Sequence, residues 1–211
     1  MNKLKIIALL ISIGSLLSFT NKIIGTKIFS DERILYLSWN KATINSVKKN
    51  LSSVQDTAAK MSYLNRLEGL EMSLPTDDFN TIDTSIDRFK FTGIIKDELK
   101  TKKSIYVIEY YELGDMITVK NYIIYRNSKK EFCIDIYVLG THKWIKNKET
   151  IRLKGYSEDA MTTHTTKYWG GVNKNDVIIS KFENGKVNYV DFYLFKTLQS
   201  NPFIEKVLTL D

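Results

Sequence analysis

The sequence predicts an α+β fold in which a long N-terminal helix, or two helices, packs on a bent antiparallel sheet or half-barrel of about six to eight strands. Apolar residues recur at threes and fours over residues 30–72, which is helical periodicity. From residue 89 onward they alternate with polar residues, and short turns separate the alternating segments. The length of 211 residues suits one domain, which we expect to combine a helical region and connecting loop (21–88) with an antiparallel β-meander (89–211).

Residues 1–20 have the pattern of an export signal, because two lysines precede an apolar run from Ile6 to Phe19. We expect this signal peptide to be cleaved before Asn21, leaving the protein in the periplasm or outside the cell. The alternative is an uncleaved signal anchor in the inner membrane, since Ile23 and Ile24 lengthen the run toward the span of a bilayer. We expect membrane contact only through this leader, and only if it stays uncleaved.

The helical segment has its most regular spacing from Ile44 to Met61, where apolar residues follow a 3-4-3-4-3 pattern. Ser30 is a candidate N-cap, and Pro75 forces the helix to stop nearby. We expect one helix, or two with a break at 38–40. The segment 33–39 is also compatible with a strand.

Eight strands are expected after the helices, and the segment 104–112 is apolar on both faces, so it should be central and covered twice. One cover would be the long helix and the other the curled sheet itself. In the strand after Glu131, the face of Phe132, Ile134, Ile136 and Val138 is expected to be core. The expected strands are 89–96, 104–113, 117–126, 131–139, 142–146, 150–154, 176–183 and 187–195.

Turn chemistry supports antiparallel neighbours and argues against a parallel nucleotide-binding sheet. Asn184 with Gly185 is the strongest hairpin signal, because both residues tolerate the positive φ of a type I′ turn. The chain should end in a short helical turn after Pro202.

The formal net charge is +7, and 26 of the 31 basic residues are lysine. The lysines are scattered, and the densest groups, at 100–103 and 143–148, fall where turns are expected. We interpret them as solvated turns, so nucleic acid is not an expected partner.

Metal and cofactor chemistry is not expected. The two histidines, His142 and His164, lie 22 residues apart, and no cysteine pair or second histidine gives zinc spacing. Cys133 is the single cysteine, which excludes an intramolecular disulfide and a lipid-anchoring cysteine after the leader. Its neighbours Glu131 and Asp135 should raise its thiol pKa, so we interpret it as structural.

A loop of about 20 residues, 155–175, is the candidate contact surface, because loops of this length in compact domains are uncommon. Together with aromatic side chains of neighbouring strands it could line a pocket for an apolar or sugar-like ligand. The same aromatic residues also suit the core of a sheet. The candidate ligand-binding residues are His164, Tyr168, Trp169, Trp144, Tyr110 and Tyr122.

These observations predict an exported, non-enzymatic binding or accessory domain. One alternative is a membrane-anchored assembly component of a cell-envelope complex, and a second is a small hydrolase that uses His164. No motif specifies a ligand, a partner protein or an oligomeric state.

Overall fold

The computed structural model of the chain describes residues 32–77, 79, 82–111, 118–141, 143–161, 165–168, 176–193 and 199–210. Within these ranges it confirms the α+β class, since helices pack on an antiparallel sheet that is not closed. The helices are the first helix (residues 32–53), α2 (Thr57–Ser73), α3 (Asp87–Glu98) and α4 (Pro202–Leu208). The strands are β1 (Ser104–Tyr111), β2 (Thr118–Arg126), β3 (Phe132–Leu139), β4 (Trp144–Lys146), β5 (Ile151–Leu153), β6 (Thr165–Tyr168), β7 (Asp176–Glu183), β8 (Lys186–Tyr193) and β9 (Gln199–Ser200).

The main sheet has the order β4-β3-β2-β1-β7-β8, with β5 also paired to β3, and every pairing is antiparallel. The β7–β8 turn has the predicted chemistry, since φ is 51° at Asn184 and 75° at Gly185. A separate two-stranded sheet joins β6 to β9. Part of the loop expected at 155–175 is therefore a strand.

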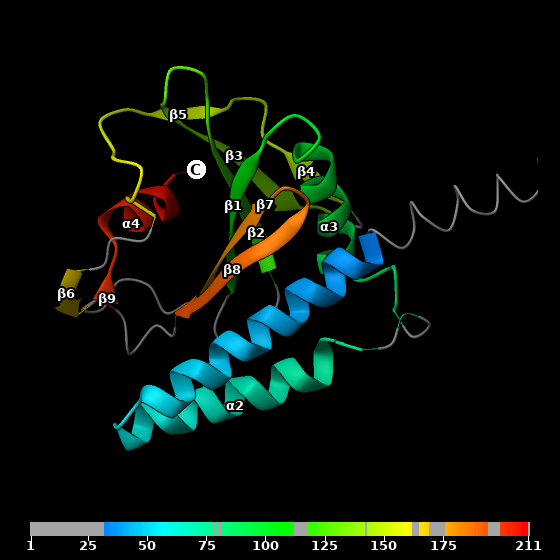
Figure 1. Cartoon of the computed structure of the whole chain (residues 1–211), viewed down its shortest axis with the longest axis vertical. Coiled ribbons are helices and arrows are strands. Elements are labelled where there is room, and N and C mark those ends of the chain that lie inside the picture. Colours follow the sequence, from blue (N-terminus) through cyan, green and yellow to red (C-terminus); the bar gives the residue numbers. More distant parts are fainter. Residues whose placement is uncertain are drawn as a thin grey trace, which may run out of the picture.

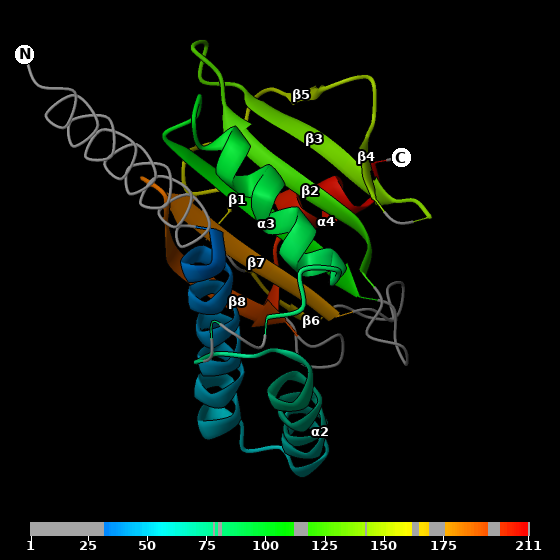
Figure 2. The ribbon, with the colours of Figure 1, turned by 90° about the vertical axis from the view of Figure 1, so that its right-hand side faces the viewer.

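Helices cover both faces of the main sheet. Figure 2 shows α3 in front of the sheet and α4 behind it, while the first helix and α2 form a hairpin that extends past one end of the strands (Figure 1). Ile105 and Val107 of β1 lie in a core cluster with α3 and the first helix, and Ile108 lies in the cluster that includes α4. The prediction that this strand is central and doubly covered is confirmed. The second cover is α4 with residues 160–161, not the curled sheet alone.

The expected strand at 89–96 is wrong, because this segment is the middle of α3. Phe89 and Phe91 lie two positions apart, which is the apolar spacing expected on one face of a strand. The residues that α3 buries include Arg88, Thr92 and Ile95, which recur with the helical period. Arg88 is polar, so its place on the buried face is not evident from hydropathy.

The expected helix break at 38–40 is also wrong. The first helix runs unbroken through residues 33–39, and the break falls at 54–56 instead. There Asp56 caps α2, its carboxylate accepting from the Ala59 amide at 2.7 Å. The break shifts the helical phase, so Met61 of the predicted seam is 52% exposed while Tyr63 is buried.

The predicted face of β3 is correct for Phe132, Ile134 and Ile136, which are core residues, whereas Val138 is 37% exposed. The opposite face of β3 is buried as well. Ser30 and the turn expected after β1 lie outside the described residues. Among the helices that the structure describes, none combines the length and hydropathy that crossing a bilayer requires.

Candidate functional site

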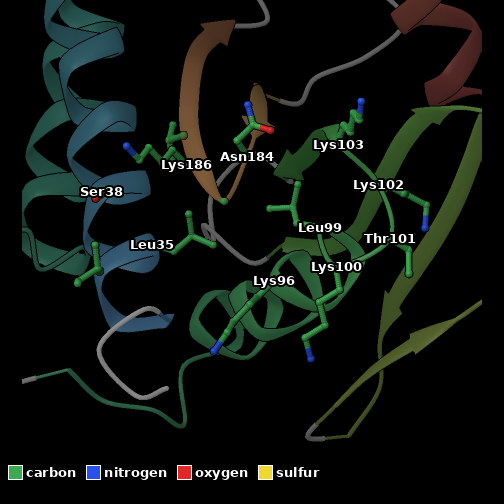
Figure 3. Close-up of a pocket in the computed structure, with 13 residues that line it drawn as sticks. Leu35, Ser38, Lys96, Leu99, Lys100, Thr101, Lys102, Lys103, Asn184 and Lys186 are labelled. Atoms are coloured by element: carbon green, nitrogen blue, oxygen red, sulfur yellow. The ribbon is translucent and has the colours of Figure 1, made fainter. Parts of the chain in front are cut away.

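A groove opens where three elements meet: the start of the first helix, the end of α3 with the loop that follows it, and the β7–β8 turn (Figure 3). Its volume is about 830 Å³. The lining residues are Ile34, Leu35, Ser38, Lys96, Leu99, Lys100, Thr101, Lys102, Lys103, Asn184, Gly185, Lys186 and Val187. Five of them are lysines and none is acidic, so the local field favours an anion.

Close packing and one backbone hydrogen bond hold the walls of the groove. A Cβ at Gly93 would lie 3.1 Å from Oε1 of Glu32, which shows that α3 lies close to the first helix here. The amide of Asn184 donates to the carbonyl of Lys103 at 3.2 Å, which fixes the β7–β8 turn against the loop before β1. The groove is therefore built on rigid elements rather than on a free loop.

The floor of the groove is apolar and its rim is cationic. Leu35 and Leu99 extend toward each other across the middle, and the amino groups of Lys96, Lys100 and Lys102 point outward from it (Figure 3). Ile34, at the same end of the first helix, is 46% exposed. This arrangement suits an amphipathic anion, with its charge at the rim and its apolar part over the floor.

Carboxylates accompany three of the lysines. Nζ of Lys96 lies 4.0 Å from Oε2 of Glu32, and Nζ of Lys100 lies 2.6 Å from Oδ1 of Asp97. Nζ of Lys102 pairs with Oε2 of Glu98. Lys103 and Lys186 have no acidic partner within ion-pair distance among the described residues. An anion in the groove can therefore pair with these two ammonium groups without displacing an existing ion pair.

The structure does not bring the predicted ligand-binding aromatics together. Tyr122 is 1% exposed and belongs to the core cluster on the α4 side. Trp144 packs against the cluster on the α3 side, where its ring centroid lies 4.9 Å from that of Phe91 and its Nε1 donates to the carbonyl of Asp87 at 2.8 Å. Tyr122 therefore has structural contacts on the α4 face of the sheet, and Trp144 has structural contacts on the α3 face.

The side chains of two further predicted site residues, Tyr110 and Tyr168, lie outside the described part of the chain. His164 and Trp169 lie outside it altogether. A ligand-binding role for the loop at 155–175 stays a prediction.

The polar face of β3 is occupied by internal contacts. Asp135, which has no exposed surface, accepts from Nζ of Lys146 at 2.7 Å and from Oγ1 of Thr150 at 2.6 Å. The hydroxyl of Tyr137 donates to Oε1 of Glu98 at 3.0 Å. Burial raises the pKa of Cys133, and the Asp135 and Glu131 carboxylates add to the effect against the opposing influence of Arg152. The thiol is thus held in its protonated, weakly nucleophilic form.

Within the described residues, no three His, Cys, Asp or Glu side chains gather as a metal site would require. Comparison of the chain with protein-family models, with curated proteins and with solved structures gave no match.

Sequence reasoning missed the groove because its parts are far apart in the chain. Lys100, Lys102 and Lys103 were interpreted as a solvated turn, and Lys96 was expected on a strand. Lys186 joins them only because β1 pairs with β7, which places the β7–β8 turn beside the start of β1. The turn at 184–185 is the one part of the groove that a local sequence signal predicted. That signal does not show that the turn lies beside Lys103.

Proposed function

We propose that this chain is an exported, non-enzymatic binding or accessory domain whose groove receives an acidic, partly apolar ligand. One observation carries the proposal: the groove combines an apolar floor with a rim of five lysines, two of which lack an acidic partner among the described residues. The leader at residues 1–20 supports export.

The lysine rim and the apolar floor are both needed, because neither gives enough binding affinity by itself. A solvent-exposed ion pair contributes only about 0–1 kcal/mol, so isolated lysines give little affinity. An apolar floor adds about 25 cal/mol for each Å² of apolar ligand surface that it removes from water. The two contributions together favour amphipathic anions over inorganic ions and over uncharged amphiphiles.

A binding role also agrees with the chemistry of the buried polar groups. The thiol of Cys133 is kept protonated, and Asp135 is engaged by Lys146 and Thr150. The hydrolase alternative depends on His164, which lies outside the described residues. No described contact favours it.

The test of binding is calorimetric titration with octyl phosphate and with a hexaglutamate peptide, using octyl glucoside as the uncharged comparison. We expect octyl phosphate to bind and octyl glucoside not to bind. The Lys103→Gln/Lys186→Gln variant should lose this binding, whereas Lys60→Gln/Lys129→Gln, which removes the same charge from exposed sites on α2 and the β2–β3 turn, should retain it. Equal binding by both variants would contradict the proposed site.

Export has a separate test. N-terminal sequencing of the protein from the extracytoplasmic fraction should begin near Asn21. Full-length protein in the membrane fraction would support the anchored alternative, and full-length protein in the cytosol would contradict export.

A second candidate function is the membrane-anchored assembly component, and the outer side of α2 favours it. Met61, Leu64 and Met72 are 52%, 40% and 82% exposed and lie within one side of this helix. Exposed apolar side chains that share a helix face suit a protein partner. Cross-linking in membranes should capture a partner through this face, and Met61→Lys/Met72→Lys should abolish the cross-link without lowering the melting temperature.

A further inference from the structure

We infer that the acidic ligand of the groove is an anionic phospholipid, bound by its headgroup phosphate at the surface of the membrane that the leader enters. This inference rests on the proposed function and specifies its ligand. It follows from the position of the groove along the chain, from the distribution of charge and apolar surface in it, and from the way each ligand source would reach it.

The groove lies close in sequence to the apolar run. Ile34, Leu35 and Ser38 come from the first two turns of the first helix, and Ile34 follows Ile24 by only ten residues. Ten residues span at most about 33–36 Å when fully extended. Before the leader is cleaved, the groove is therefore held within reach of the headgroup layer of the membrane that the leader enters.

The distribution of groups matches the parts of a phospholipid. Lys103 and Lys186 lie on two sides of the groove (Figure 3), and neither has a carboxylate partner among the described residues, so each is available to an anionic headgroup. The exposed side chain of Ile34 and the floor residue Leu99 provide an apolar surface for the glycerol and the first methylenes. Membrane-proximal lysines are also attracted to anionic lipid surfaces, and each contributes to the attraction.

An acidic peptide is the competing ligand, and the observations favour lipid over it. Peptides that bind in grooves commonly pair with an exposed strand edge or lay a helix in an apolar trough. Here the edge strand β8 contributes only its first two residues, Lys186 and Val187, and the rest of the lining comes from the β7–β8 turn, helix ends and a loop. Before cleavage, a lipid next to the leader also has a high effective concentration, so modest contacts suffice for its first binding.

The experiment uses short-chain lipids below their critical micelle concentrations, so that insertion of the leader into bilayers does not contribute. The protein, in whichever form the cell yields it, is titrated with dihexanoyl phosphatidylglycerol and with dihexanoyl phosphatidylcholine. We expect the anionic lipid to bind at least tenfold more tightly, with affinity falling as salt is raised. Equal affinities would overturn the inference, because the lysine rim would then not be selecting the headgroup charge.

The groove variants locate the binding. Lys103→Gln/Lys186→Gln should weaken phosphatidylglycerol binding at least tenfold, and the charge-matched Lys60→Gln/Lys129→Gln variant should bind as the wild type does. All four lysines are exposed, so the fold should tolerate both changes, and unchanged melting temperatures check this. An equal loss in both variants would show a nonspecific charge effect and overturn the inference.

The two proposals fail in different ways. If hexaglutamate or octyl phosphate binds through Lys103 and Lys186 while phosphatidylglycerol does not, the lipid assignment is wrong and the acidic groove stands. If none of the three probes depends on these lysines, both the inference and the proposed function fail.

Discussion

The guanidinium of Arg88 on α3 and the carboxylate of Glu109 on β1 form a two-point ion pair inside the protein, with Nε–Oε1 and Nη2–Oε2 distances of 3.0 and 2.9 Å. Their side chains are 8% and 1% exposed. Nη1 of Arg88 also donates to Oδ1 of Asn40 at 2.7 Å, and the guanidinium stacks 3.9 Å from the ring of Trp39. One side chain thereby joins α3, the first helix and the sheet, which are the elements that form the groove.

Removing one member of this pair should be costly. Glu109→Leu removes a two-point counterion from the buried Arg88 charge, and we expect a loss of about 3–5 kcal/mol in the free energy of unfolding. Arg88→Leu/Glu109→Leu removes both charges and should recover part of that loss, although Asn40 and Thr43 then lose a donor. Urea denaturation of the single and double variants measures the difference. A loss below about 1 kcal/mol in Glu109→Leu would show that the pair is not buried as described.

The hairpin of the first helix and α2 allows a second prediction, which compares a buried residue with an exposed one. Val47 is fully buried against Tyr63, Leu70 and neighbouring sheet residues, whereas Met61 is 52% exposed. Val47→Asp should lower the free energy of unfolding by more than about 3 kcal/mol, since it places a carboxylate in a desolvated contact. Met61→Asp should change it by less than about 0.5 kcal/mol. Equal effects, measured by thermal or urea unfolding, would mean that the hairpin does not pack on the sheet.

The strands of the main sheet were predictable because their signals are local. Alternation within eight or nine residues and the Asn184–Gly185 turn require no knowledge of distant partners. The double-sided apolar pattern of the segment 104–112 indicated a central strand for the same reason. What it could not indicate is that α4, formed by residues near the C-terminus, supplies the second cover.

Part of what the sequence did not reveal has one physical origin, which is burial of polar groups that find partners far along the chain. Arg88 pairs with Glu109 and Asn40, and Oγ1 of Thr43 accepts from the same guanidinium at 2.9 Å. These residues resemble solvent-facing positions in sequence, so hydropathy did not reveal the buried face that α3 and the first helix share. The groove was missed for a related reason, because Lys103 and Lys186 meet only after β1 pairs with β7.

Trp144 tests whether a predicted ligand-binding residue is structural. Trp144→Ala removes the edge contact with Phe91 and the hydrogen bond to the carbonyl of Asp87, so we expect a loss of about 3 kcal/mol. Trp144→Phe keeps a ring but leaves that carbonyl without its donor, and should cost about 1 kcal/mol. Unchanged stability in both variants, together with lost binding of octyl phosphate, would show that Trp144 is a ligand-binding residue and not a structural one.

Tyr137 should make the stability of the protein sensitive to alkaline pH. Its side chain is 5% exposed, and its hydroxyl donates to Glu98. Burial, with the negative charge of Glu98, raises the pKa of this phenol well above its ordinary value of 10.0. The folded state therefore keeps a proton that the unfolded chain loses above about pH 10.

The sign follows from proton linkage. Above pH 10 the unfolded state binds fewer protons than the folded state, so the free energy of unfolding falls as pH rises, by up to about 1.4 kcal/mol per pH unit for one such group. Below pH 10 this contribution is fully present. Tyr137→Phe has no proton to lose, and its stability should decline less steeply than that of the wild type when urea midpoints are compared between about pH 8 and 11. Some slope should remain, because burial also raises the pKa of Tyr125. Parallel curves for the two proteins would show that Tyr137 titrates as an exposed phenol and that its contact with Glu98 does not persist in solution.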